Sequence, residues 1–190
     1  ARAYASMGVK ANDFVTIALP NNIEFFIACI AVWKLGATPQ PVSYRLPQKE
    51  LQAIVELAKA PLVVGVEQSL LPNHRVIPPG FTPDATLSDT ALPEMIARHW
   101  KAPTSGGSTG RPKLIVSGDP ATFDLAVDSL VRIPLNQVSL IPGPVYHNGP
   151  FIAAMHSLLR GNQIILMPTF DAEQTLQLIE RHQVAWAVMV

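Results

Sequence analysis

The chain has 190 residues, of which 48% are apolar and 15% are charged, so it can bury a sizeable core. Its 14 Lys and Arg balance its 14 Asp and Glu, and this zero net charge argues against a basic surface for nucleic acid. A single cysteine, Cys29, excludes an internal disulfide. The longest apolar stretch, residues 23–35, is shorter than the roughly 20 residues of a membrane span, so we expect a cytoplasmic protein.

Taken in chain order, the first part alternates helices and strands. Residues 1–7 are typical of the last turns of a helix, and Gly8 stands where a left-handed cap would fall. Asn21 or Asn22 is expected to cap a mostly buried helix that runs to Leu35 and ends at Gly36. The other expected elements are strands at residues 14–19, 37–42 and 62–66 and a helix from Pro47 to about Lys59. This order predicts parallel strands with helices on the faces of the sheet.

The second part repeats the alternation after residues 72–93, which are rich in proline and polar side chains and typical of a surface loop. Strands are expected near residues 114–116, 138–141, 163–167 and 184–190, and helices within 120–132, at 150–160 and from an Asp171 cap to about His182. The first helix has no preceding cap and the last strand stops without a turn. We therefore expect a chain that is truncated at both ends.

The most informative segment is a loop rich in glycine and hydroxyl side chains, Thr104-Ser105-Gly106-Gly107-Ser108-Thr109-Gly110-Arg111-Pro112-Lys113. Glycines let the backbone approach an anion closely, hydroxyls can donate to phosphate oxygens, and Lys113 adds a positive charge. The plainer alternative is a flexible turn. Pro112, which fixes φ, and the positive charge of Lys113 after it are not typical of a flexible linker. The loop is also not a Walker A loop, because no Gly-Lys-Ser/Thr sequence leads into a helix.

The segment from Ser105 to Lys113 resembles the phosphate loop of the adenylate-forming superfamily, which includes acyl-CoA synthetases, peptide-synthetase adenylation domains and beetle luciferases. The family pattern is a run of Ser, Thr and Gly, then Gly, any residue, Pro and Lys. Gly106 stands where a second hydroxyl is more usual, and Thr104 where an aromatic or apolar residue is common. The loop is most similar to that of the bile-acid–CoA ligase branch, which points to lipid or bile-acid metabolism. Residues 2–19, 21–46 and 143–149 resemble other parts of the family, so the resemblance covers almost the whole chain.

The resemblance implies both a fold and a reaction. The fold is α/β, a mostly parallel β-sheet flanked by helices, as in the Rossmann-like three-layer subdomain of the family's large N-terminal domain. Residues 1–190 would be a partial N-terminal AMP-binding domain without the C-terminal domain that carries the catalytic lysine. The reaction is that of an ATP-dependent carboxylate–CoA ligase, with ATP, Mg²⁺ and coenzyme A as cofactors and a small-molecule carboxylic acid as substrate. Because the later family motifs are absent from this sequence, the chain alone is expected to be inactive.

The resemblance also assigns candidate site residues. The residues expected to grip the phosphates of ATP are Ser105, Gly106, Gly107, Ser108, Thr109, Gly110 and Lys113. The residues with a catalytic assignment are Lys113 and His147. His147 precedes an expected helix and would form, with Tyr146, a wall or gate of the acyl pocket; a hydrogen-bonded structural histidine is the alternative. No two histidines lie three or four residues apart, so no zinc site is expected, and no residue is assigned as a metal ligand.

Other functions stay open beside the acyl-CoA ligase. Within the superfamily the alternative is a peptide-synthetase adenylation domain that loads a carrier protein, with luciferase-like oxidation more remote. Outside it, the chain could be a non-catalytic nucleotide-binding or interaction module, or a plain phosphate-binding α/β domain. The abundance of Ile, Leu, Val and Met suggests a fatty, aryl or steroid acid as substrate, and a homodimer is left open.

Overall fold

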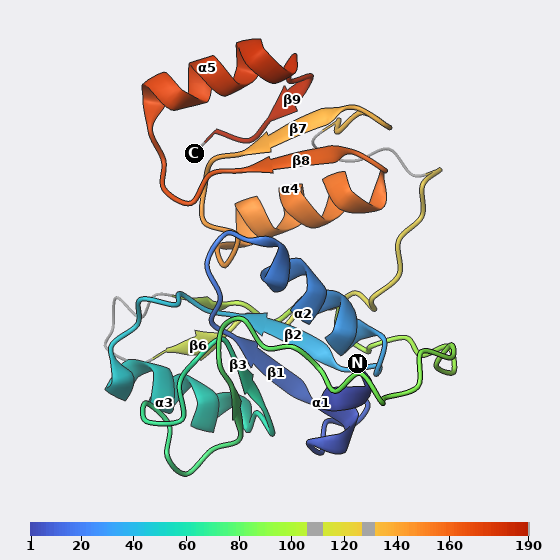
Figure 1. The fold of residues 1–190 in the computed structure, drawn as a ribbon, viewed down its shortest axis with the longest axis vertical. Helices are drawn as coiled ribbons and strands as arrows, with labels where there is room; N and C mark the ends of the chain where they lie inside the picture. Colours follow the sequence, from blue (N-terminus) through green and yellow to red (C-terminus); the bar gives the residue numbers. More distant parts are fainter. Residues whose placement is uncertain (106–111, 127–131, 190) are drawn as a thin grey trace. The chain divides into compact units, whose positions relative to one another are not determined.

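The computed structural model describes residues 1–105, 112–126 and 132–189. The chain divides into two compact units, one made of Ala1–Leu19 and Ile23–Thr122 and the other of Pro20–Asn22 and Phe123–Val190. Each unit carries helices packed on short parallel strands (Figure 1). The expected α/β class, with mostly parallel sheets flanked by helices, is therefore confirmed. Within the described ranges, no helix combines the length and the apolar character needed to cross a membrane.

The first unit is built on a parallel sheet in the order β2-β1-β3-β4. Its strands are β1 (Phe14–Ile17), β2 (Thr38–Pro41), β3 (Val63–Val64) and β4 (Val76–Ile77), and its helices are α1 (Arg2–Ser6), α2 (Ile23–Trp33) and α3 (Gln48–Ala58). Helix α2 connects β1 to β2, which lies on one side of β1 in the sheet. Helix α3 connects β2 to β3, which lies on the other side of β1. Because both crossovers are expected to be right-handed, α2 and α3 cover opposite faces of the sheet (Figure 1).

Most expected elements of this unit are present with shorter bounds. Gly8 and Gly36 follow α1 and α2 with φ of 95° and 67°, which confirms the predicted left-handed position at Gly8. The prediction that residues 72–93 form only a loop is wrong at β4, where Val76 and Ile77 pair with β3 in parallel. A two-residue strand is too short to produce a periodic pattern, so the sequence carries no signal for it.

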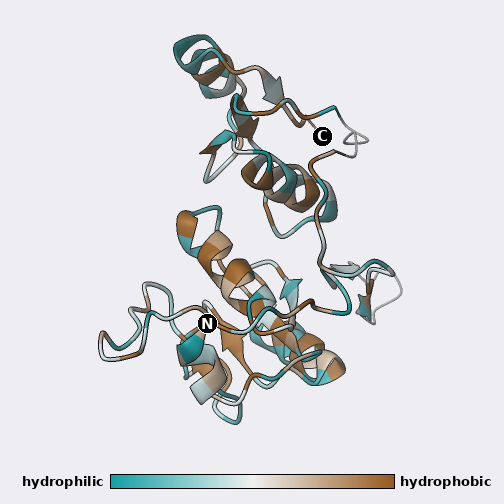
Figure 2. Ribbon diagram, turned by 90° about the vertical axis from the view of Figure 1, so that its right-hand side faces the viewer, coloured by the Kyte–Doolittle hydropathy of each residue, from teal (hydrophilic) through white to brown (hydrophobic). Residues whose placement is uncertain are grey.

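One part of the core of the first unit lies between the sheet and α3. The members of one buried cluster are Ala18, Val42, Leu51, Ile54, Val55, Val63, Val66 and Leu71. Helix α2 buries Phe25 and Cys29 completely, so the cysteine is a core residue. The expectation that α2 is buried on most sides holds for one face only, because Ile23 and Ile27 are 75% and 58% exposed. Figure 2 shows the apolar character of α2 as a mostly brown ribbon.

A hairpin of two short strands, β5 (Thr104–Ser105) and β6 (Lys113–Leu114), lies in the same unit and is antiparallel. The expected strand at residues 114–116 is displaced, since Ile115 and Val116 lie outside β6 and are exposed. The segments before β5 and after β6 also pair with each other. Ile115 N donates to Pro103 O at 2.8 Å, and Ser117 N donates to Lys101 O at 3.0 Å. The hairpin is thus the tip of a longer ribbon.

The second unit repeats the strand order of the first in its sheet β8-β7-β9, and all pairs are parallel. Its elements are β7 (Val138–Ile141), α4 (Asn148–Leu159), β8 (Gln163–Leu166), α5 (Ala172–His182) and β9 (Trp186–Ala187). The predicted Asp171 cap is confirmed, because its Oδ1 accepts from Gln174 N at 2.7 Å. The helix expected within 120–132 is absent from residues 120–126, and residues 127–131 lie outside the described residues.

Candidate functional site

The base of the predicted phosphate loop is the β5–β6 hairpin. Ser105 lies directly opposite Lys113 in its register, so the strand pairing brings together two candidate residues eight positions apart. Lys113 is exposed and Ser105 is half-buried. The candidates Gly106, Gly107, Ser108, Thr109 and Gly110 lie outside the described residues. The structure therefore shows where the loop starts and ends, and the phosphate-binding roles stay predictions.

Backbone and side-chain hydrogen bonds hold the segment leading into β5 against the sheet of the first unit. Thr38 Oγ1 donates to His99 O at 2.8 Å, and Ala102 N donates to Pro39 O at 3.0 Å. Trp33 Nε1, at the end of α2, donates to Trp100 O at 2.8 Å. Because β2 and α2 belong to the buried core, the start of the loop is carried on a rigid support.

Gln40 extends this support to the first strand of the hairpin. Its side chain is completely buried on β2, where Nε2 donates to Thr104 Oγ1 at 3.1 Å and Oε1 accepts from Thr16 Oγ1. Thr16 on β1 thereby fixes which way the Gln40 amide faces. Sequence reasoning missed this residue, although a glutamine among the Ala, Thr, Pro and Val of the expected strand at residues 37–42 is a signal that could have revealed it.

A second lysine lies near the hairpin in a different environment. Lys101 is 8% exposed, and its ammonium group stands 4.9 Å from the centre of the Trp100 ring. Burial lowers the pKa of Lys101 from its ordinary value, while the nearby charge of Asp119 acts in the opposite direction. Lys113, by contrast, is exposed at the hairpin, so it is better placed than Lys101 to bind an anion from solution.

His147, the other candidate, belongs to the second unit and lies at the junction predicted from the sequence. It is the N-cap residue of α4, with extended backbone dihedral angles, and its side chain makes no capping hydrogen bond. Its ring is exposed and lies 4.6 Å from the ring of Tyr146. The segment follows the carboxyl end of β7, the central strand of the sheet, and ligands of open α/β sheets bind outside carboxyl strand ends. The position suits a binding role, which stays a prediction.

The backbone around His147 is held by a compact turn. His147 N donates to Pro144 O at 3.0 Å, and Val145 is completely buried beneath the turn. Gly143 lies so close to Pro150 of α4 that a Cβ atom on it would stand 2.9 Å from the proline ring. Asn21 also binds this turn through its side chain. Of the two asparagines expected to cap α2, Asn21 is therefore engaged elsewhere, and Asn22 is the residue directly before the helix.

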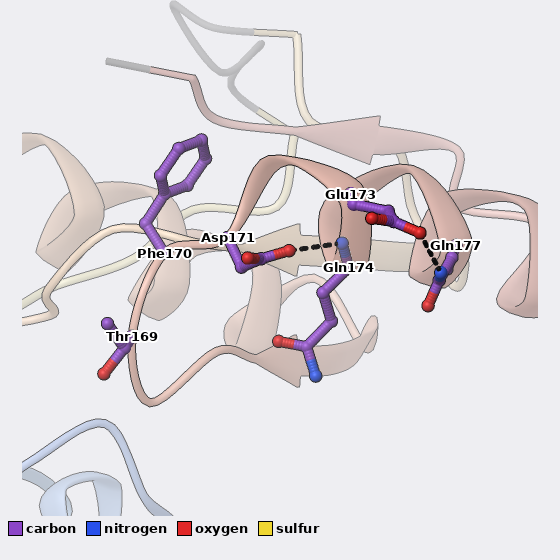
Figure 3. Close-up of a pocket in the computed structure, with 6 residues that line it drawn as sticks. All are labelled: Thr169, Phe170, Asp171, Glu173, Gln174 and Gln177. Atoms are coloured by element: carbon purple, nitrogen blue, oxygen red, sulfur yellow. Dashed lines mark hydrogen bonds between the residues drawn. The ribbon is translucent and has the colours of Figure 1, made fainter.

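An open hollow of about 500 Å³ lies beside the amino end of α5 (Figure 3). The residues that line it are Thr169, Phe170, Asp171, Glu173, Gln174 and Gln177. Both carboxylates in the lining accept hydrogen bonds from α5 itself. Asp171 caps the helix, and Glu173 Oε1 accepts from Gln177 Nε2 at 3.2 Å. Of the predicted site residues that the structure describes, Ser105, Lys113 and His147 do not line this hollow.

Comparison with known proteins identifies the family. The sequence pattern of the AMP-binding enzyme family matches residues 1–190. The chain is 24% identical over 199 residues to long-chain-fatty-acid–CoA ligase FadD13 of Mycobacterium tuberculosis, an alignment that covers 94% of this chain and 39% of that protein. It is 26% identical over 229 residues to 2,3-dihydroxybenzoate-AMP ligase of Bacillus subtilis, covering 100% of this chain and 40% of that protein.

A solved structure shows the same fold. The O-succinylbenzoate coenzyme A synthetase of Bacillus subtilis, in complex with ATP and a magnesium ion, superposes with a TM-score of 0.75 at 19% identity, covering 97% of this chain and 52% of that one. The chain belongs to the AMP-binding enzyme family, as the phosphate loop predicted. It spans about two fifths of the length of the two curated relatives named above.

Proposed function

We propose that the full-length protein is an ATP-dependent acid–thiol ligase that adenylates a carboxylic acid and transfers the acyl group to coenzyme A. The observation that carries this proposal is the pairing of Ser105 with Lys113 at the base of the glycine-rich loop. Membership of the AMP-binding enzyme family supports it. So do the named relatives, which are a fatty-acid–CoA ligase and an aryl-acid–AMP ligase.

In the first step a carboxylate oxygen of the acid attacks the α-phosphorus of ATP. The bond between the α-phosphorus and the bridging oxygen breaks, and pyrophosphate leaves with that electron pair. Lys113 faces the charge that develops on the departing group, and the Ser105 hydroxyl donates to a phosphate oxygen beside it. Because the hairpin is fixed to the core through Gln40, these donors need little rearrangement as the charge grows.

In the second step the sulfur of coenzyme A attacks the acyl carbon, AMP leaves with the electrons of the acyl–phosphate bond, and the thiol proton is lost. His147 and Tyr146 would form part of the wall beside the acyl group. Magnesium would accompany ATP and share its phosphate charge. The Ser105 hydroxyl would be one candidate ligand of such an ion, while no three His, Cys, Asp or Glu side chains in the described ranges gather as a metal site.

Carboxylate-dependent ATP–pyrophosphate exchange by the full-length protein tests the proposal. The panel would include fatty, aryl and steroid acids, because the bile-acid branch stays a prediction. We expect exchange with one acid class and none without acid. Lack of exchange with every acid, in a folded protein that binds ATP, would contradict the ligase assignment and favour a non-catalytic nucleotide-binding module.

The acceptor is tested separately with the acid that supports exchange. We expect coenzyme A to yield an acyl thioester. Transfer to a phosphopantetheinylated carrier protein, with no transfer to coenzyme A, would instead favour the peptide-synthetase type of adenylation domain. The 190-residue chain assayed beside the full-length protein is expected to form no acyl-CoA, because it spans only part of the length of its relatives.

A further inference from the structure

A single side chain joins the carboxyl ends of two strands in the second unit. Asn21 Nδ2 donates to Gly143 O and to Met167 O, both at 2.8 Å, and its Oδ1 accepts from Val145 N at 2.9 Å. Gly143 and Val145 follow β7, and Met167 follows β8. Asn21 is half-buried, whereas Val145 and Met167 are almost completely buried.

The bonds act on the turn that presents His147. They hold both flanks of Pro144, whose carbonyl oxygen accepts from His147 N at 3.0 Å. Val145 is buried and Gly143 packs closely against Pro150, so the turn is also fixed from below. The exposed ring of His147 has no capping bond of its own. Its position therefore depends on the backbone that Asn21 holds.

The chemistry of the site calls for asparagine in particular. Two carbonyl oxygens need donors and one N–H needs an acceptor, and a primary amide supplies both donors and the acceptor from a single short side chain. Aspartate would keep the acceptor for Val145 but would place a carboxylate oxygen against two carbonyl oxygens. Alanine would leave all three backbone groups without this partner.

We propose that Asn21 is a positioning residue for the acid substrate, acting through the Tyr146–His147 segment. This inference rests on the proposed function, in which that segment forms a wall of the acyl pocket. Asn21 does not touch the reacting atoms in this proposal. It fixes the segment to the ends of both strands, and it thereby sets the affinity for the acid while leaving the phosphate-gripping hairpin unchanged.

The same two strands provide a matched control at their other ends. Asn162 Oδ1 accepts from Gln137 N at 2.9 Å, and its Nδ2 donates to Ser139 Oγ at 2.9 Å. Asn162 thus joins the amino ends of β7 and β8 as Asn21 joins their carboxyl ends. Replacing either residue removes side-chain bonds to the sheet, but only Asn21 binds the turn before His147.

The test compares Asn21→Ala, Asn21→Asp and Asn162→Ala in the full-length protein by ATP–pyrophosphate exchange. We expect the Asn21 variants to raise KM for the acid or lower kcat on the order of 10- to 100-fold, since misplacement by about 1 Å can cost that much. KM for ATP should stay within about twofold of wild type. Asn162→Ala should lower Tm and leave KM for the acid unchanged.

Hydrogen exchange of the peptide that covers residues 143–149 gives a readout independent of catalysis. Faster exchange there in Asn21→Ala, but not in Asn162→Ala, is expected. If the Asn21 and Asn162 variants lower Tm equally and none of them changes KM for the acid or kcat, the positioning role is overturned. A wild-type protein that shows no ATP–pyrophosphate exchange with any acid would contradict the proposed function. Separately, unchanged hydrogen exchange of residues 143–149 in Asn21→Ala would show that Asn21 does not hold this turn.

Discussion

Gln40 Nε2 donates a hydrogen bond to Thr104 Oγ1 at 3.1 Å, and this bond connects a fully buried strand with the first residue of the hairpin that carries the phosphate loop. The two residues are 64 positions apart in the sequence. Ser105, the first candidate for phosphate binding, is the next residue along the chain. The Gln40 amide group therefore adds a side-chain bond between the core of the first unit and the strand from which the loop starts.

Replacing Gln40 by methionine should weaken ATP binding without changing the acid preference. The variant keeps an unbranched side chain of similar length but loses the donor to Thr104 and the acceptor for Thr16. A hydrogen bond contributes about 0.5–1.5 kcal/mol, so KM for ATP in the exchange assay should rise about 2- to 10-fold. The measurement is pyrophosphate exchange by the full-length protein at saturating acid.

The control for this variant is Gln52→Met on the exposed side of α3, where Gln52 Nε2 donates to Glu56 Oε1. That change should leave KM for ATP within about twofold of wild type, because exposed polar contacts contribute little. A double-mutant cycle with Thr104→Val isolates the Gln40–Thr104 pair. Strictly additive effects on KM for ATP would show that the bond does not couple the core to the loop.

Lys113→Ala should reduce acid-dependent pyrophosphate exchange by about 100- to 1,000-fold, the range seen when one preorganised donor to a developing charge is lost. The exposed position of Lys113 predicts that Tm stays close to that of wild type. Lys10→Ala provides the control, since Lys10 is an exposed cation of the same unit. Equal exchange rates in wild type and Lys113→Ala would remove Lys113 from the site.

The parts of the fold that the sequence predicts well are those with a repeating local pattern. The strand at Val138–Ile141 was expected with the same bounds, and the Asp171 cap of α5 was found with its hydrogen bond to Gln174. Both depend on neighbouring residues, through apolar runs or through a side chain that reaches three residues ahead. The short β4 strand carries no such pattern and was missed.

The supports of the candidate site could not be predicted from local patterns. Gln40 and Thr104 meet across 64 residues, and Asn21 meets Gly143 across 122. The local rule offered Asn21 or Asn22 as the cap of α2, since an asparagine just before a helix is a good cap, and it gave no sign that Asn21 meets the ends of two distant strands. Three hydrogen bonds to the ends of β7 and β8 outweigh the single bond that a cap would provide.

His147→Ser should separate the binding role of His147 from its structural role. Serine is a better cap than histidine, and it can accept from Gly149 N, since Pro150 has no N–H. We expect the Tm to stay unchanged or rise, while KM for the acid rises about tenfold, roughly the loss of 1.4 kcal/mol of binding. KM for ATP serves as the internal control. An unchanged KM for the acid would leave His147 with only a structural role.

His156, one turn before the end of α4, should make the stability of the protein dependent on pH. Its ring is half-buried and lies 5.2 Å from the ring of Phe123. Burial lowers the pKa of His156, and the positive charge of Arg160 lowers it further. The unfolded chain therefore binds a proton near the ordinary histidine pKa of about 6.5, while the folded protein binds it only at lower pH.

Because the unfolded state then binds more protons than the folded state, stability falls as the pH drops below about 6.5, and it stops falling below the folded pKa. Thermal unfolding of the full-length protein between about pH 7 and pH 5 should show this loss, and His156→Gln should reduce it. In Arg160→Leu the loss should shrink but persist, because burial is the larger cause. Arg160 Nε and Nη1 have no hydrogen-bond partner in the described part of the chain, so leucine breaks no hydrogen bond of these two atoms there. A pH dependence that is the same in wild type and His156→Gln would assign the loss to another group.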